Sequence, residues 1–203
     1  MKKSFLLLVL LTLCGFCFSQ VNLLTLIKPG TQLVYLVQSG EQQYYFMVKV
    51  KTVAPAVTFD WEMTEPASMK GSITHTATAM ASATTMHNMF TPGDVTLDDN
   101  TISVWLSKAT FTNLRKSSAM LSINQGEAPK KMGLTGESKV VKILLDAQKE
   151  TIEEEIAKEF NADGNPIKTE EFISFYNSVK MPVILRMKNA AFAITLKEIR
   201  MSK

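Results

Sequence analysis

Apolar and polar residues alternate along much of the first third of the chain. The alternation runs through residues 31–38, is interrupted by the turn sequence at 39–41, and resumes at 44–50. It returns at 57–63, where one face is wholly apolar and the other wholly polar, and again at 69–75. A period of two is typical of half-buried strands, and short turns join consecutive strands antiparallel. These residues therefore predict a four-stranded antiparallel meander.

The next segment changes period. Residues 77–90 are rich in Ala, Met and Thr without Gly or Pro, and their spacing predicts one helix that ends at Thr91-Pro92-Gly93. Residues 94–106 return to an extended pattern. Ser107 is then expected to cap a short helix that runs through Leu114, because a serine side chain accepts hydrogen bonds from the first helical amides.

The second half begins with a predicted strand at 119–124 and a predicted long loop at 126–136, which is rich in Gly and contains a Pro. Residues 137–180 fit two interpretations, because their apolar positions match both helical and strand spacing. The Asp163-Gly164 turn between two similar runs favours a hairpin, whereas aromatic residues at helical spacing favour helix-loop-helix. The segment 183–196 predicts a closing hairpin.

The loop around Asp163 also resembles a calcium-binding loop of the EF-hand type. With Glu159 at the first loop position, Asn161, Asp163 and Gly164 take positions three, five and six, and Glu170 takes position twelve. The first position departs from the pattern, which requires Asp. The alternative is an ordinary Asp-Gly turn with solvated carboxylates.

Methionine and histidine form a second candidate site. Met80, Met86, His87 and Met89 fall within the predicted helix, and His75 lies on the strand before it. Thioether and imidazole groups are ligands suited to Cu(I). The alternative is packing, since methionine commonly fills irregular gaps in a core.

Catalytic motifs are absent from the sequence. It contains no Gly-x-Ser-x-Gly, no His-Glu-x-x-His and no phosphate-binding glycine loop. Asp60 and Glu62 could project from one strand face at a spacing that suits a glycosidase pair, but on an alternating strand they are expected to face solvent. The sequence therefore predicts a protein without enzymatic activity and without a cofactor.

The N-terminus has the pattern of an export signal. Residues 1–20 combine a charged start, an apolar run and a small-x-small end, which predicts cleavage before Gln20 and one β-rich domain at 20–203. Cleavage there removes Cys14 and Cys17, so the mature chain is expected to lack cysteine. Large residues precede both cysteines, which disfavours a lipid anchor. The apolar run of this signal is too short to span a bilayer, which needs roughly 20 apolar residues, and no other run approaches that length.

Charge excludes one class of partner. The expected cleavage removes two of the 22 basic residues, so the mature chain nearly balances its 19 acidic residues. A net charge of +1, from 20 basic and 19 acidic residues, is too small to predict a nucleic-acid partner.

Several segments together resemble a group of uncharacterised exported proteins of Gram-negative bacteria, to which no activity is assigned. The similarity rests on Lys28-Pro29-Gly30-Thr31 and on residues 59–63, 104–108 and 181–187. It implies an architecture rich in antiparallel sheet and transfers no functional residue. More distantly, a meander with an inserted helix is similar to the half-barrel carriers that move lipoproteins or other hydrophobic cargo through the periplasm.

We therefore expect an α+β fold in which a large, curved meander or half-barrel of about eight to ten strands packs around one or two short helices. The first functional hypothesis is an exported, periplasmic or extracellular module that binds another protein or envelope component. The second is a carrier of an apolar small molecule or lipid, lined by Phe59, Trp61 and Met63, with Met86 on a flexible lid. Calcium binding through the 159–170 loop is the third.

Overall fold

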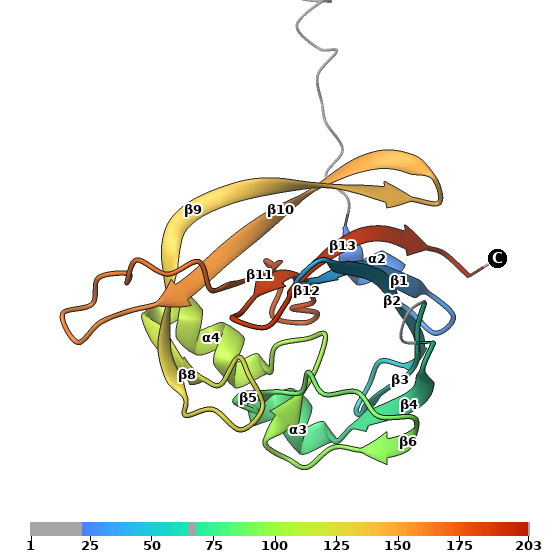
Figure 1. Ribbon diagram of the computed structural model, residues 1–203, viewed down its shortest axis with the longest axis horizontal. Helices are drawn as coiled ribbons and strands as arrows, with labels where there is room; N and C mark the ends of the chain where they lie inside the picture. The colour runs from blue at the N-terminus through green and yellow to red at the C-terminus, as the bar shows by residue number, and fades with distance from the viewer. Residues whose placement is uncertain (1–21, 65–67, 203) are drawn as a thin grey trace, which may run out of the picture.

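The computed structural model of the protein describes residues 22–64 and 68–202 (Figure 1). Strands account for 53% of it and three short helices for 11%. This confirms the predicted α+β class dominated by antiparallel sheet. The predicted signal segment and both cysteines lie outside the described residues.

One curved sheet of eleven strands organises the molecule, in the order β6-β4-β3-β2-β1-β13-β12-β11-β10-β9-β8. A short parallel pairing between β13 and β9 closes the last five sequential strands into a barrel. Figure 1 shows the long β9–β10 hairpin arching over one side, while β1 to β4 and β6 curve away on the other. The strands are β1 (Gln32–Ser39), β2 (Gln42–Thr52), β3 (Val57–Met63), β4 (Lys70–His75), β6 (Gly93–Thr96), β8 (Ser118–Leu121), β9 (Lys130–Leu145), β10 (Gln148–Glu159), β11 (Phe172–Tyr176), β12 (Ile184–Lys188) and β13 (Ala193–Arg200).

The predicted meander is confirmed strand by strand. β1 to β4 pair antiparallel in sequence order, and β1 also pairs with the C-terminal strand β13. On β3, Phe59, Trp61 and Met63 are buried, whereas Glu62 is exposed. The period of two in the sequence therefore reports which face of this sheet meets the core.

The predicted helix at 77–90 is wrong beyond its first turn and a half. Helix α3 spans Ala77–Ser82, after which β5 (Thr85–Met86) pairs parallel with β7 (Thr101–Ile102). The amides of Thr84 and Thr85 donate to the carbonyl of Asn100. These tertiary bonds outweigh the helix propensity of the Ala and Met residues.

The other helices are short and capped. α4 (Lys108–Lys116) begins where the sequence predicts, and the Ser107 hydroxyl accepts a hydrogen bond from the Thr110 amide at 3.2 Å. α2 (Leu23–Leu26) is a single turn capped by the Asn22 side chain and was not predicted. No helix in the described part of the chain is long and apolar enough to cross a membrane.

Residues 137–180 contain strands joined by turns and a loop, and no helix, so the helix-loop-helix interpretation is wrong. β10 pairs with β11 across the loop that carries Asp163-Gly164, as the hairpin interpretation requires. β10 also forms a longer hairpin with β9, whose turn at Asp146-Ala147 carried no sequence signal. The predicted loop at 126–136 is too long, because β9 begins at Lys130 and pairs there with β8.

Nearly all buried apolar residues of the described chain form one cluster, to which both the sheet and the inserted segment with α3, β5, β7 and α4 contribute. The largest fully buried side chains in it come from both layers: Trp61, Trp105, Tyr35, Phe59 and Phe175. The inserted segment therefore packs on the concave side of the sheet.

Candidate ligand-binding pocket

A small apolar pocket opens where the segment after β5 meets the sheet. Its free volume is about 70 Å³. Strands β1 to β3 contribute Val37, Phe46 and Met63, and the opposite wall is formed by Met86 and Phe90. Residues of β12, β13 and their connection complete it: Ile184, Met187, Phe192 and Ile194.

Two of the four predicted ligand-binding residues reach this pocket. Met63 and Met86 line it, whereas Phe59 and Trp61 do not. The Phe59 ring lies 5.6 Å from the Trp105 ring, and both are buried in the core. Phe59 and Trp61 therefore support the pocket without facing it.

The wall after β5 is fixed by backbone and ring contacts. The Met86 amide donates to the carbonyl of Ser122 at 2.8 Å, and the His87 amide donates to the carbonyl of Ile102 at 2.8 Å. The Phe90 ring then packs on the sheet, with its centroid 4.6 Å from that of Phe46. The stretch from Met86 to Phe90 is thus held at three points, although only Met86 belongs to a strand.

The pocket lining includes four side chains with polar groups: Tyr44, His87, Asn88 and Ser103. Burial lowers the pKa of His87, against the opposing influences of Gln125 and Asp98. The imidazole is therefore neutral at neutral pH and presents a polar but uncharged edge to the pocket.

Behind Ser103 lies a fully buried histidine. The Ser103 amide and hydroxyl both lie 3.1 Å from Nε2 of His75. Because the amide can only donate, Nε2 must be the acceptor and the ring proton sits on Nδ1. Burial, together with repulsion from His87 once that ring is protonated in acid, lowers the pKa of His75 to about 3. His75 is consequently a fixed neutral acceptor for Ser103.

The residue after Ser103 has an unusual backbone. Val104 has φ = +65°, and the Trp105 amide donates to the Ser103 carbonyl at 2.7 Å. Such a tight turn around a β-branched residue costs about 1–3 kcal/mol. The carbonyl of Val104 accepts a 2.7 Å hydrogen bond from Ile184, which ties this strained floor of the pocket to β12.

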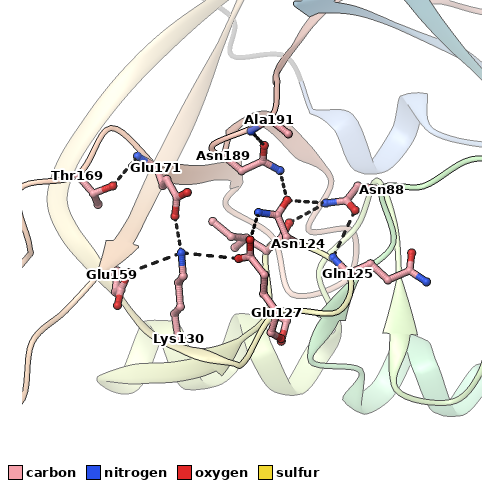
Figure 2. A network of polar contacts seen from close by, with 12 residues as sticks. Asn88, Asn124, Gln125, Glu127, Lys130, Glu159, Thr169, Glu171, Asn189 and Ala191 are labelled. Atoms are coloured by element: carbon pink, nitrogen blue, oxygen red, sulfur yellow. Dashed lines mark hydrogen bonds and ion pairs between the residues drawn. The ribbon is translucent and has the colours of Figure 1, made fainter. Parts of the chain in front are cut away.

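A network of asparagine side chains fixes the rim (Figure 2). Oδ1 of Asn124 accepts hydrogen bonds from the side-chain amides of Asn88 and Asn189. Oδ1 of Asn189 in turn accepts from the amides of Ala191 and Phe192, each at 2.9 Å. Since Asn88 and Phe192 line the pocket, Asn124 joins the two sides of its rim.

The network continues to an ion-pair cluster around one lysine. Nζ of Lys130 lies 2.6 Å from Glu171, 3.8 Å from Glu127 and 3.9 Å from Glu159, and the Glu127 carboxylate accepts from Asn124. The hydrogen bond to Glu171, with the charge of the three glutamates, raises the pKa of Lys130 despite its partial burial. Lys130 thereby connects the rim to the β10–β11 loop.

The predicted calcium loop is bounded by strands, whereas an EF-hand requires helices. The Glu159 carboxylate is near Lys130, and the Glu170 carboxylate pairs with Lys188. No group of three or more His, Cys, Asp or Glu side chains is placed to hold a metal among residues 22–64 and 68–202. Of the other two predicted calcium ligands, Asn161 accepts a hydrogen bond from the Asn165 amide, and Asp163 is exposed. The four predicted ligands Glu159, Asn161, Asp163 and Glu170 therefore do not surround one point.

The predicted copper ligands are also dispersed. Met86 and His87 line the pocket, but Met89 is 61% exposed and His75 is separated from the pocket by Ser103. Met80 packs against the core from α3. Helix α3 ends at Ser82, so Met86, His87 and Met89 do not lie on the element that carries Met80.

Sequence reasoning missed Ser103, Val104 and the three asparagines of the rim. Residues 101–107 are all buried, and a run of small polar and apolar residues there was the available signal. The asparagines come from three distant segments and left no pattern. Searches of known protein families, curated proteins and solved structures find no match to this chain.

Proposed function

We propose that this protein is an exported, non-enzymatic binding module that seats one apolar group of a partner molecule in the pocket between β3, β5 and β12. The observation that carries the proposal is an apolar pocket with few polar groups and a hydrogen-bonded rim. The N-terminal sequence supports export.

The pocket volume defines the size of that group. Sites for whole small molecules usually measure roughly 300–1,000 Å³, and this pocket has about 70 Å³. That volume suits a single apolar side chain or chain end, so a larger partner would anchor itself here with one group. Met89, 61% exposed beside the pocket residues His87 and Phe90, offers further apolar surface to such a partner.

His75, which contacts the Ser103 hydroxyl, is unsuited to catalysis. A general base works best with a pKa near the working pH, and burial holds the pKa of His75 at about 3. Its contact with Ser103 supports a structural role, in which the imidazole stabilises the strained turn at Val104.

Small apolar probes test the proposal. With methyl-labelled methionine, toluene is expected to shift the NMR signals of Met63, Met86 and Met187, which line the pocket. Met120 is 53% exposed on β8 and serves as the internal control. Shifts of equal size at Met120 would show nonspecific binding and contradict the proposal.

A substitution that fills the pocket can be compared with the same substitution at an exposed site elsewhere. Ile194 lines the pocket and is partly exposed, so Ile194→Phe should occupy the space and abolish the toluene shifts. Val179 is exposed elsewhere, and Val179→Phe should leave them unchanged. Mass spectrometry of the protein from its native host tests export separately, with an N-terminus at Gln20 as the expected result.

A further inference from the structure

A second concave surface lies between the end of the β9–β10 hairpin and strands β1, β2 and β13, with a free volume of about 560 Å³. Its sheet side carries Leu36 and Tyr45, which are directly paired across β1 and β2. Their neighbours Val37, Tyr44 and Phe46 line the pocket described above. Because side chains alternate along a strand, the groove and the pocket lie on opposite faces of the β1–β2 hairpin.

Three lysines line this groove without a carboxylate partner. Lys142, Lys149 and Lys197 are exposed, and none of them forms an ion pair with another described residue. Glu150 is the acidic residue in the lining. By contrast, Lys130 and Lys188 each contact glutamate. The groove therefore has an excess of positive charge that the protein itself does not neutralise.

Apolar side chains lie among these lysines. Tyr45 is 47% exposed and Leu144 is 37% exposed, and the buried Ile143 lies beside Leu144. Exposed apolar surface next to unpaired cations suits a ligand that has an apolar chain and a negative head. Neither a fully polar anion nor a neutral hydrocarbon would satisfy both features.

We propose that this groove binds a single-chain anionic amphiphile, with the alkyl chain on Leu36, Tyr45 and Leu144 and the carboxylate among Lys142, Lys149 and Lys197. The volume lies within the roughly 300–1,000 Å³ range of small-molecule sites, which the pocket on the opposite face does not reach. A bilayer surface would be met by a protruding basic face rather than a concave groove. The occupant is thus a monomeric amphiphile.

A series of ligands with one tail and three head groups tests the charge requirement. Dodecanoate, dodecanol and dodecyltrimethylammonium are titrated below their micelle concentrations and followed by amide NMR shifts of β1, β2, β9 and β13. Dodecanoate should bind at least tenfold more tightly than dodecanol, and the cation more weakly than either. Salt should weaken the binding of dodecanoate but not that of dodecanol. Equal affinity of the anion and the alcohol would overturn the proposal.

Two charge-matched triple variants locate the site. Lys142→Gln, Lys149→Gln and Lys197→Gln together should weaken dodecanoate binding at least tenfold and leave dodecanol unchanged. The control replaces three other exposed lysines that have no ion pair, Lys108, Lys116 and Lys168, by Gln and should change the affinity less than twofold. Equal losses in both variants would mean that only net charge matters, which would overturn the proposal.

Two further measurements separate this site from its alternatives. Ile194→Phe, which fills the opposite pocket, should leave dodecanoate binding intact, and loss of binding there would place the ligand in the pocket and refute the groove. Vesicles containing anionic phosphatidylglycerol should bind no more tightly than neutral phosphatidylcholine vesicles. Binding to anionic vesicles without binding of monomeric dodecanoate would identify a membrane-surface site and overturn the proposal.

Discussion

At Ser103 and Val104, three constraints meet on two consecutive residues. His75 accepts its hydrogen bonds, Val104 turns the chain with a positive φ, and Ile184 donates to the Val104 carbonyl. The strain at Val104 persists because its neighbours hold it from both sides. A neutral histidine suits this position, since a protonated ring would lose the acceptor that the Ser103 amide requires.

The buried histidine predicts a loss of stability in acid. The pKa of His75 is about 3 in the folded state and about 6.5 in the unfolded chain, so below pH 6.5 the unfolded state binds more protons. Stability is therefore fully present above pH 6.5 and lost as the pH falls toward 3, by about 2 kcal/mol between pH 7 and 5. Chemical denaturation at several pH values measures this loss.

The variant His75→Gln tests whether His75 causes this change of the unfolding free energy with pH. The variant is expected to be less stable at pH 7, because the ring packs 5.5 Å from Phe59 and 6.0 Å from Trp105. Its free energy of unfolding should nevertheless change less between pH 7 and 5 than that of the parent protein. An unchanged slope would show that other groups, such as His87, cause the pH dependence.

A buried ion pair gives a second prediction at this scale. Glu154 is 1% exposed, and its carboxylate pairs with Arg186 through two guanidinium nitrogens. Glu154→Ala leaves a partly buried guanidinium unpaired and should cost about 2–4 kcal/mol. The double variant Glu154→Leu, Arg186→Met should recover most of that loss, because it removes both charges. Urea unfolding of the three proteins checks this; a double variant as unstable as the single one would contradict it.

At the scale of elements, the sequence predicted strands well where one face is buried and the other exposed, as in β3. The sequence-based prediction failed where hydrogen bonds between distant segments determine the backbone conformation. Residues 83–90 have helical composition, but the amides of Thr84 and Thr85 bond to Asn100. Of the four predicted ligand-binding residues, only Met63 and Met86 line the pocket. The spacing of apolar residues indicates which side chains are buried, but not which buried side chains border a cavity.

The β9–β10 turn allows a test of local backbone strain. Asp146 and Ala147 have φ of +46° and +69°, a region that glycine adopts at no steric cost. Ala147→Gly should therefore stabilise the protein by about 0.5–1 kcal/mol, although glycine normally destabilises. Ala162→Gly, in the exposed β10–β11 loop, should be neutral or destabilising. Thermal unfolding measures both, and a lower Tm for Ala147→Gly would refute the strain argument.

At the scale of the whole molecule, one curved sheet presents two different surfaces. The small pocket lies on the concave face, where the inserted segment packs, and the larger groove lies on the opposite face of β1 and β2. Figure 1 shows the β9–β10 hairpin arching over this side of the sheet. Closure of the barrel through β13 and β9 places that hairpin over the sheet. The two proposed sites therefore depend on the same strands but need not share a ligand.

The rim network predicts that distant loops are coupled. Asn124 bonds the side chains of Asn88, Asn189 and Glu127, which lie on three separate segments (Figure 2). Asn124→Ala removes these bonds and should cost about 1–3 kcal/mol. Hydrogen exchange should accelerate at residues 87–90 and 188–192 together, and toluene binding in the pocket should weaken. Lys130→Met, which breaks only the ion pairs further along, should leave both loops protected. Faster exchange at residues 122–127 alone would contradict the prediction. The asparagines would then be local turn contacts, and the strained turn at Val104 would instead determine the shape of the pocket.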